Sequence, residues 1–234
     1  MLSFFLPETV LVCLIVYILI QMIVCLHLQQ NRKNVSLELL NIVKNTFFWL
    51  SVMYVFLLSS KYVGFFSQGQ VVLSSYTLFL KLLLSLSTLT ILETLPIYLH
   101  YKNRHFFELP LILSLASFFM LFLISATHLF TGLLLLMGFS INLYILILFE
   151  ALNPLVREAG IKYFYLSAFS SGLIVMGVFL IMFVFKTGTF TAINFFLTTK
   201  SSMFIAKAEI LIVFGVTLML VGLLFKLSAF PGHL

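Results

Sequence analysis

Residues 210–234 read ILIVFGVTLMLVGLLFKLSAFPGHL, and this stretch decides the kind of fold that the chain adopts. A run of more than 15 mostly apolar residues precedes a single amine, Lys226, and the helix breaker Pro231-Gly232 follows. A broken helix is tolerated at membrane depth only where it lines a water-filled cavity or is covered by protein. We therefore expect a transmembrane helix that is broken at Pro231, and a functional role for Lys226.

The composition of the whole chain agrees with a membrane protein. Of the 234 residues, 62% are hydrophobic and only 9% are charged, and the mean hydropathy is +1.21. A soluble domain carries about 25% charged residues. These values exclude a soluble globular enzyme and a disordered chain. The net charge of +6 comes from Lys and Arg residues that are spread along the chain, so we expect membrane-flanking cations and no nucleic-acid partner.

The chain has room for about seven crossings of the bilayer, since roughly 20 apolar residues span its hydrocarbon core as one helix. We expect an all-α, polytopic membrane protein with a single membrane domain over residues 1–234. Polar connectors are expected at residues 29–45 and 150–159, and a looser amphipathic connector at 186–202. The expected helices cover residues 4–28, 46–66, 71–99, 108–126, 129–149, 161–185 and 204–228.

Phenylalanine is unusually abundant, with 28 residues in the chain. A coding bias toward A+T produces this excess and is common in organelle genomes. The N-terminus has no Arg-rich, Ser-rich transit peptide. We therefore expect an organelle-encoded, multi-pass protein of the mitochondrial inner membrane.

Two further ionisable residues lie next to an apolar segment. Glu158 and Lys162 are four residues apart, so they share one face of a helix in the favourable order for an ion pair. The pair is either an interfacial anchor or part of a polar track inside the membrane. An amine in a low-dielectric site gives up its proton more readily, and a neighbouring carboxylate opposes this. Such a group can load and unload protons when another process supplies the energy.

Motifs of redox and nucleotide chemistry are absent from the sequence. It contains no CxxC, GxGxxG, Walker or HExxH motif, and no pair of histidines at haem-ligand spacing. We therefore expect no cofactor, no metal and no redox step in this chain.

Several motifs resemble one family. Residues 222–233, GLLFKLSAFPGH, resemble the G-x-x-F-K-L-S-A-x-P-x-H signature of NADH dehydrogenase subunit 2, an antiporter-like membrane subunit of respiratory complex I. Residues 158–164, EAGIKYF, with SSG at 170–172, are similar to the family's E-A-x-x-K-Y-F…S-S-G. LPE at 6–8 and FLKLL at 79–83 resemble its L-P-E and F-F-K-L-L.

The resemblance implies a fold about twice as long as this chain, of which the chain is the first half. A second polypeptide, from a split gene, would then complete the fold. Residues on the implied proton path are Lys162, Lys226, Glu158 and His233, and Lys81, Glu8 and Ser140 are possible structural or polar positions. The resemblance also implies that FMN, iron–sulfur clusters and ubiquinone reside in other subunits of the complex. Its implied partners are the other membrane-arm subunits, and lipids such as cardiolipin.

One position departs from the family pattern. The family places a Glu on its fifth helix in G-x-E-x-x-S-L-x-x-Y, and here Ser140 and Tyr144 fit that pattern while the Glu position is Met137. A thioether carries neither charge nor proton. Glu150 lies about 20 Å further along a helix and cannot simply substitute. Either another chain supplies a carboxylate, or this half-channel pumps poorly or not at all.

Three hypotheses follow for the function. The first is a core subunit of proton-pumping NADH:ubiquinone oxidoreductase, whose lysines form a proton half-channel coupled to quinone reduction elsewhere. The second is a stand-alone cation/proton antiporter half. The third is a structural complex I subunit that has lost pumping.

Overall fold

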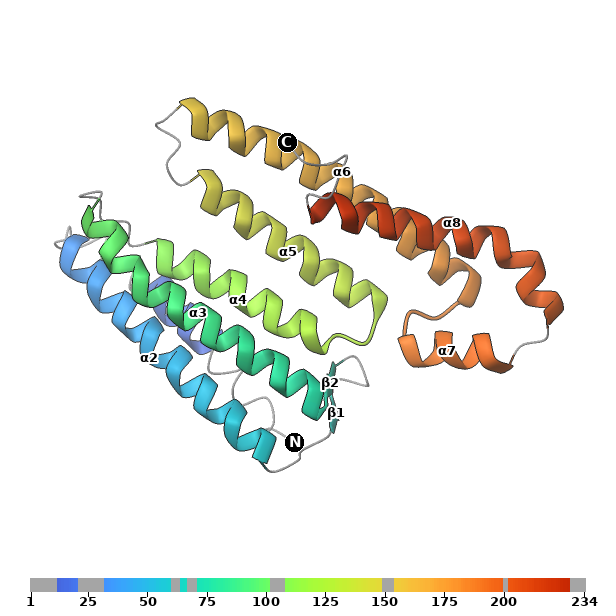
Figure 1. Cartoon of the computed structure of the whole chain (residues 1–234), viewed down its shortest axis with the longest axis horizontal. Helices are drawn as coiled ribbons and strands as arrows, with labels where there is room; N and C mark the ends of the chain where they lie inside the picture. The colour runs from blue at the N-terminus through green and yellow to red at the C-terminus, as the bar shows by residue number, and fades with distance from the viewer. Residues whose placement is uncertain are drawn as a thin grey trace. The chain divides into compact units, whose positions relative to one another are not determined.

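The structure, a computed structural model, describes residues 12–20, 32–59, 64–66, 71–101, 108–148, 154–199 and 202–227 (Figure 1). Its labelled helices are α2 (Arg32–Ser59), α3 (Ser75–Tyr101), α4 (Leu109–Ser125), α5 (Leu129–Ile147), α6 (Pro154–Phe185), α7 (Phe190–Thr199) and α8 (Ser202–Lys226). A two-stranded sheet pairs β1 (Gly64–Phe66) with β2 (Val71–Leu73). Residues 12–20 are helical as well.

Within these residues, five helical segments are long and apolar enough to cross a membrane, and α4 is a shorter apolar helix. The candidate spans are Glu38–Ser59, Ser75–Tyr98, Leu129–Ile147, Pro154–Phe185 and Glu209–Lys226. The predicted all-α, multi-pass membrane fold is confirmed. The predicted break at Pro231 lies outside the described residues.

The chain divides into two compact units, where the sequence predicted one membrane domain. The first comprises Met1–Phe65 and Val72–Ser125, and the second comprises Phe66–Val71 and Ala126–Leu234. Helices α2, α3 and α4 pack together in the first unit, and α6 packs against both α5 and α8 in the second.

Helix α2 begins at Arg32, although the sequence analysis placed a polar connector as far as residue 45. No Gly or Pro interrupts residues 32–45, and strong helix formers such as Leu, Glu and Lys occur among them. A buried stripe with spacings of three and four residues continues through this segment, formed by Leu39, Val43, Phe47, Leu50 and Tyr54. The helix therefore begins earlier than expected because its apolar face, packed against α3, already starts at Leu39, before the predicted helix start at residue 46.

Helix α6 also begins earlier than expected, at Pro154 instead of residue 161. Proline is favoured in the first turn of a helix because its fixed φ suits the helix and its missing N–H would have no partner there. Glu158 and Lys162 therefore lie inside a 32-residue helix, and the predicted polar connection is partly helical.

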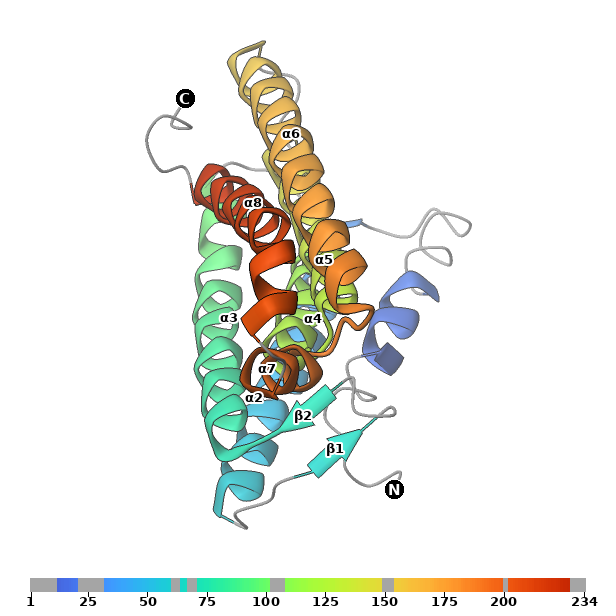
Figure 2. The ribbon, with the colours of Figure 1, turned by 90° about the vertical axis from the view of Figure 1, so that its right-hand side faces the viewer.

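Helices α6 and α8 lie side by side, and glycines allow their backbones to approach closely (Figures 1 and 2). A Cβ added at Gly177 of α6 would lie 2.6 Å from the backbone oxygen of Gly215 in α8. A Cβ added at Gly222 of α8 would lie 2.8 Å from the backbone oxygen of Ser170 in α6. Small residues permit such close contact between membrane helices. This contact positions the last turn of α8, which carries Lys226, against α6.

The segment between α6 and α8, expected to be a loose connector, contains the short helix α7. Its Ile193 and Phe196 pack against an apolar cluster of the second unit, which includes Ile174, Val178 and Ile181. The link before α5 joins this region through backbone hydrogen bonds from Leu129 to Gly188 (2.8 Å) and from Phe190 to Thr127 (3.1 Å). His128 caps α5 in this link, as its Nδ1 accepts from the Phe130 N–H at 3.2 Å.

Candidate functional site

A cavity of about 530 Å³ in the second unit brings together three of the four predicted proton-path residues. Its wall is formed by α6 and the last turn of α8, with one residue from α5. The lining residues include three ionisable side chains that the sequence singled out, Glu158, Lys162 and Lys226. Polar groups from Tyr163, Ser167 and Ser170 also line it. Lys162 and Lys226 are 64 positions apart, so the packing of α8 on α6 is what places them on one cavity.

Glu158 and Lys162 form an ion pair on α6. The Lys162 Nζ lies 2.9 Å from a Glu158 carboxylate oxygen, as the four-residue spacing predicted. Both side chains are more than half exposed in the isolated chain, at 62% and 57%. The cavity is therefore accessible from outside along this side of α6.

Lys226 is half-buried and reaches across to α5. Its Nζ donates to the backbone oxygen of Leu136 at 3.3 Å and lies 3.5 Å from the Ser140 Oγ. Both oxygens are uncharged. Within the described part of the second unit, the one ion pair given by the structure is Glu158–Lys162, so Lys226 makes none there.

A second, smaller cavity of about 350 Å³ lies between α5 and α6. Met137 lines it, together with Ser140 and Tyr144, so the position where the family pattern has Glu faces this space. Ser167 lines both cavities. The Lys226 side chain thus lines the larger cavity while its amine contacts a serine of the smaller one.

The remaining residues that the sequence singled out are not among the described residues that line the two cavities. Lys81 lies on α3 in the first unit and is 1% exposed, on the same buried stripe as Leu78 and Ser85. Glu8 and His233 lie outside the described residues, so their predicted roles stay predictions.

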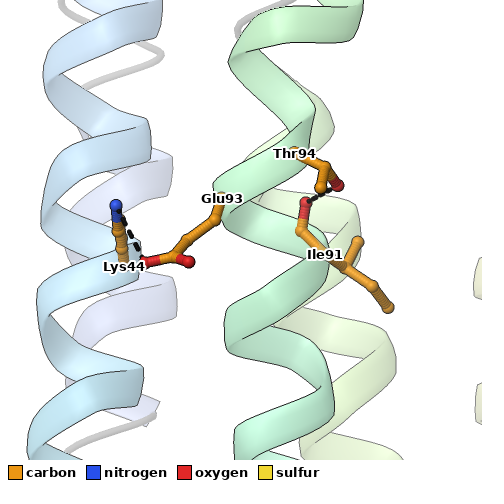
Figure 3. Close-up of polar contacts among 4 residues, drawn as sticks. All are labelled: Lys44, Ile91, Glu93 and Thr94. Carbon is orange, nitrogen blue, oxygen red and sulfur yellow. Dashed lines mark hydrogen bonds and ion pairs between the residues drawn. The ribbon is translucent and has the colours of Figure 1, made fainter.

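Sequence reasoning missed an ion pair in the first unit. The Lys44 Nζ of α2 lies 3.2 Å from a Glu93 carboxylate oxygen of α3, and the two side chains point toward each other (Figure 3). Both residues lie within candidate membrane spans. The sequence assigned Lys44 to a polar connector, and nothing in it indicates which helix neighbours which.

Among the described residues, no group of three or more His, Cys, Asp or Glu side chains could hold a metal ion. The ionisable groups of the main cavity are two amines and one carboxylate. This donor set suits proton exchange better than metal binding, since metal sites in proteins draw on several carboxylate, imidazole or thiolate ligands.

Residues 126–234, nearly the whole of the second unit, match the family described as NADH:quinone oxidoreductase/Mrp antiporter, TM. The match covers a little under half of the 234 residues. The family resemblance predicted from the lysine motifs is confirmed, while the division of the subunit into two chains stays a prediction.

Curated relatives carry the name NADH-quinone oxidoreductase subunit N. The protein of Beijerinckia indica subsp. indica is 34% identical over 166 residues, which cover 71% of this chain and 33% of the relative. That of Parvibaculum lavamentivorans is 31% identical over 169 residues, again 71% of this chain and 33% of the relative. The chain spans about a third of the length of these relatives.

Solved structures show the same fold. A chain of respiratory complex I from Thermus thermophilus with bound aureothin gives a TM-score of 0.72 at 19% identity, covering 97% of this chain and 45% of that one. A chain of the membrane-bound sulfane sulfur reductase, an archaeal respiratory membrane complex, gives 0.68 at 14% identity, covering 97% and 46%. The chain is therefore similar in fold to about half of each of these membrane subunits.

Proposed function

We propose that this chain is part of a membrane-arm subunit of a proton-pumping NADH:quinone oxidoreductase, and that Lys162 and Lys226 carry protons through its main cavity. The single observation that supports this most strongly is the cavity itself, which two amines from distant parts of the sequence line together. The family match of residues 126–234 and the names of the relatives support the reaction class.

Each residue has a distinct role in this proposal. Glu158 forms an ion pair with the Lys162 amine at 2.9 Å, and both side chains line the cavity. Lys226 contacts neutral oxygens, so it binds its proton without a counter-charge and releases it more readily. The cavity thus contains one amine with a carboxylate partner, Lys162, and one with neutral partners, Lys226, and both take part in proton transfer. His233, which the motif places beyond Lys226, is proposed to continue the path.

Replacing each lysine by alanine tests the proposal. In the assembled complex in membrane vesicles, we expect Lys162→Ala and Lys226→Ala to lower proton pumping by about 10- to 100-fold per quinone reduced, while redox chemistry in other subunits continues. Lys186→Ala is the matched control, because Lys186 is exposed in the link after α6. Wild-type pumping in both cavity variants would refute the transport role.

A stand-alone cation/proton antiporter half is the second candidate, because the family description names Mrp antiporters as well. Copurification with mass spectrometry separates the two. We expect the chain to copurify with NADH-oxidising subunits, with other membrane-arm subunits, and with a second chain that completes the fold. Recovery with antiporter subunits alone would favour the second candidate. A structural subunit without transport would show wild-type pumping in both lysine variants.

The mitochondrial inner membrane is proposed as the location on composition, and the relatives named above are bacterial. FMN, iron–sulfur clusters and ubiquinone would reside in other subunits, and cardiolipin is a proposed lipid partner. Fractionation of the source cell, followed by detection of the chain, tests the location.

A further inference from the structure

Ser140 joins the two cavities of the second unit through its contact with Lys226. The side chain of Ser140 is 9% exposed, and its hydroxyl donates to the Met137 backbone oxygen at 2.8 Å. Because the hydroxyl hydrogen is used in that bond, the lone pairs of the oxygen are left to face the Lys226 ammonium, 3.5 Å away. The Leu136 backbone oxygen, 3.3 Å from the same nitrogen, completes a pair of acceptors on α5.

The contact between Ser140 and Lys226 links residues that line different cavities. Lys226 lines the larger cavity, Ser140 lines the smaller one, and Ser167 borders both. The amine therefore lies where the two spaces adjoin. Without the serine oxygen, its flexible four-carbon stem could turn back toward α6 and leave the smaller cavity.

We propose that Ser140 is a positioning residue that holds the Lys226 amine between the two cavities, so that a proton on Lys226 is exchanged with the smaller cavity as well as the larger. This inference rests on the proposed function, and it extends the path to the space lined by Met137 and Tyr144. Ser140 itself gains and loses no proton: it accepts a hydrogen bond from the ammonium and retains its own bond to the Met137 oxygen.

Proton pumping by two variants of equal shape tests the proposal. Thr and Val share a branched outline, and only Thr has a hydroxyl, which can form the same bond to the preceding turn of a helix. In the assembled complex, we expect Ser140→Thr to retain pumping and Ser140→Val to lose about tenfold, the order expected when a charged donor loses an acceptor. Equal pumping in the two variants would overturn the proposal. Because both variants add the same bulk, a general packing defect would affect them alike.

The pH dependence of pumping in Ser140→Ala gives a second test, because a purely structural role of Ser140 would leave it unchanged. Loss of an acceptor disfavours the protonated amine, so the alkaline limb of the pumping profile should move to lower pH in Ser140→Ala. The titratable groups that line the two cavities beside Lys226 come from α6 and α5: Glu158, Lys162, Tyr163 and Tyr144. They remain in place in every variant of the series.

Ser114→Ala is the matched control. Ser114 lies in α4, is fully buried, and makes the same type of bond to the preceding turn, 2.8 Å to the Leu111 oxygen. We expect the pH profile of this control to match that of the wild type. An unshifted profile in Ser140→Ala would overturn the positioning role. If Lys226→Ala abolishes pumping while Ser140→Val does not, the proposed function stands and this inference falls; wild-type pumping in Lys226→Ala would refute the proposed function itself.

Discussion

Met137 lines the smaller cavity, and it leaves α5 without a carboxylate at the position where the family pattern has one. The residues that contact Lys226 are instead Leu136, through its backbone, and Ser140. Neutral oxygens orient an ammonium but do not compensate its charge, so they stabilise the protonated state less than a carboxylate does. We therefore expect the residue at position 137 to influence proton exchange at Lys226.

Introducing the missing carboxylate should change the pH dependence of pumping. Met137→Glu places an acid on α5 between Leu136 and Ser140, the two residues whose oxygens lie nearest the Lys226 amine, and a carboxylate near an amine favours its protonated form. We expect the alkaline limb of the pumping profile to move to higher pH by about one unit, measured in vesicles. Met137→Gln, of similar shape but uncharged, should behave as the wild type. Identical profiles for the Glu and Gln variants would show that position 137 does not act on Lys226.

The ion pair between Lys44 and Glu93 makes a prediction about stability. Reversing one charge brings like charges together, so Lys44→Glu and Glu93→Lys should each lower the free energy of unfolding by about 1 kcal/mol, since both side chains are partly exposed. The double reversal should recover most of this loss. Thermal unfolding of the full chain in detergent measures it. If the loss of stability in the double variant equals the sum of the losses in the two single variants, the contact contributes nothing.

At the scale of elements, the contact between α6 and α8 determines the geometry of the site. Gly177 and Gly222 stand where a side chain would meet the backbone of the neighbouring helix. Because lipid tails are as apolar as the helix surfaces, close packing supplies much of the association in place of the hydrophobic effect. The cavity that holds Lys226 depends on this approach.

Two glycines of α6 provide a matched test of that packing. Gly177→Ala adds a methyl group 2.6 Å from the Gly215 oxygen, whereas a Cβ at Gly172 meets nothing within 4 Å. We expect Gly177→Ala to lower the free energy of unfolding by about 1–3 kcal/mol through overpacking. Gly172→Ala should be neutral or stabilise by up to about 1 kcal/mol, because Ala is the better helix former. Equal melting temperatures for the two variants would contradict the packing described here.

Much of the helical fold could be predicted from hydropathy, because membrane-length apolar runs are a strong signal. Helix starts were predicted less well. The extra turns of α2 and α6 are polar enough to resemble loops. In α2 the helix is favoured by apolar packing, and in α6 by the proline at its N-terminus. Helix α7 was missed because its ten residues are too short to cross a bilayer and are stabilised by the apolar cluster of the second unit.

At the scale of the whole molecule, local patterns predict ionisable residues but not which of them meet. The spacing of Glu158 and Lys162 was enough to predict their contact, since both lie on one helix. The meeting of Lys226 with α5, and of Lys44 with α3, depends on which helices are neighbours, and no local signal in a single sequence carries that information. The serine that contacts Lys226 could be named from the family pattern, but its role could not.

Proton exchange by Lys226 is the central claim, and an arginine at this position tests it most directly. Lys226→Arg keeps the positive charge, but a guanidinium does not lose its proton in proteins. The measurement is the number of protons pumped per quinone reduced in vesicles that contain the assembled complex. We predict that Lys226→Arg lowers this number as far as Lys226→Ala does, while quinone reduction continues. Wild-type stoichiometry in Lys226→Arg would show that position 226 requires only a charge, and would contradict the account.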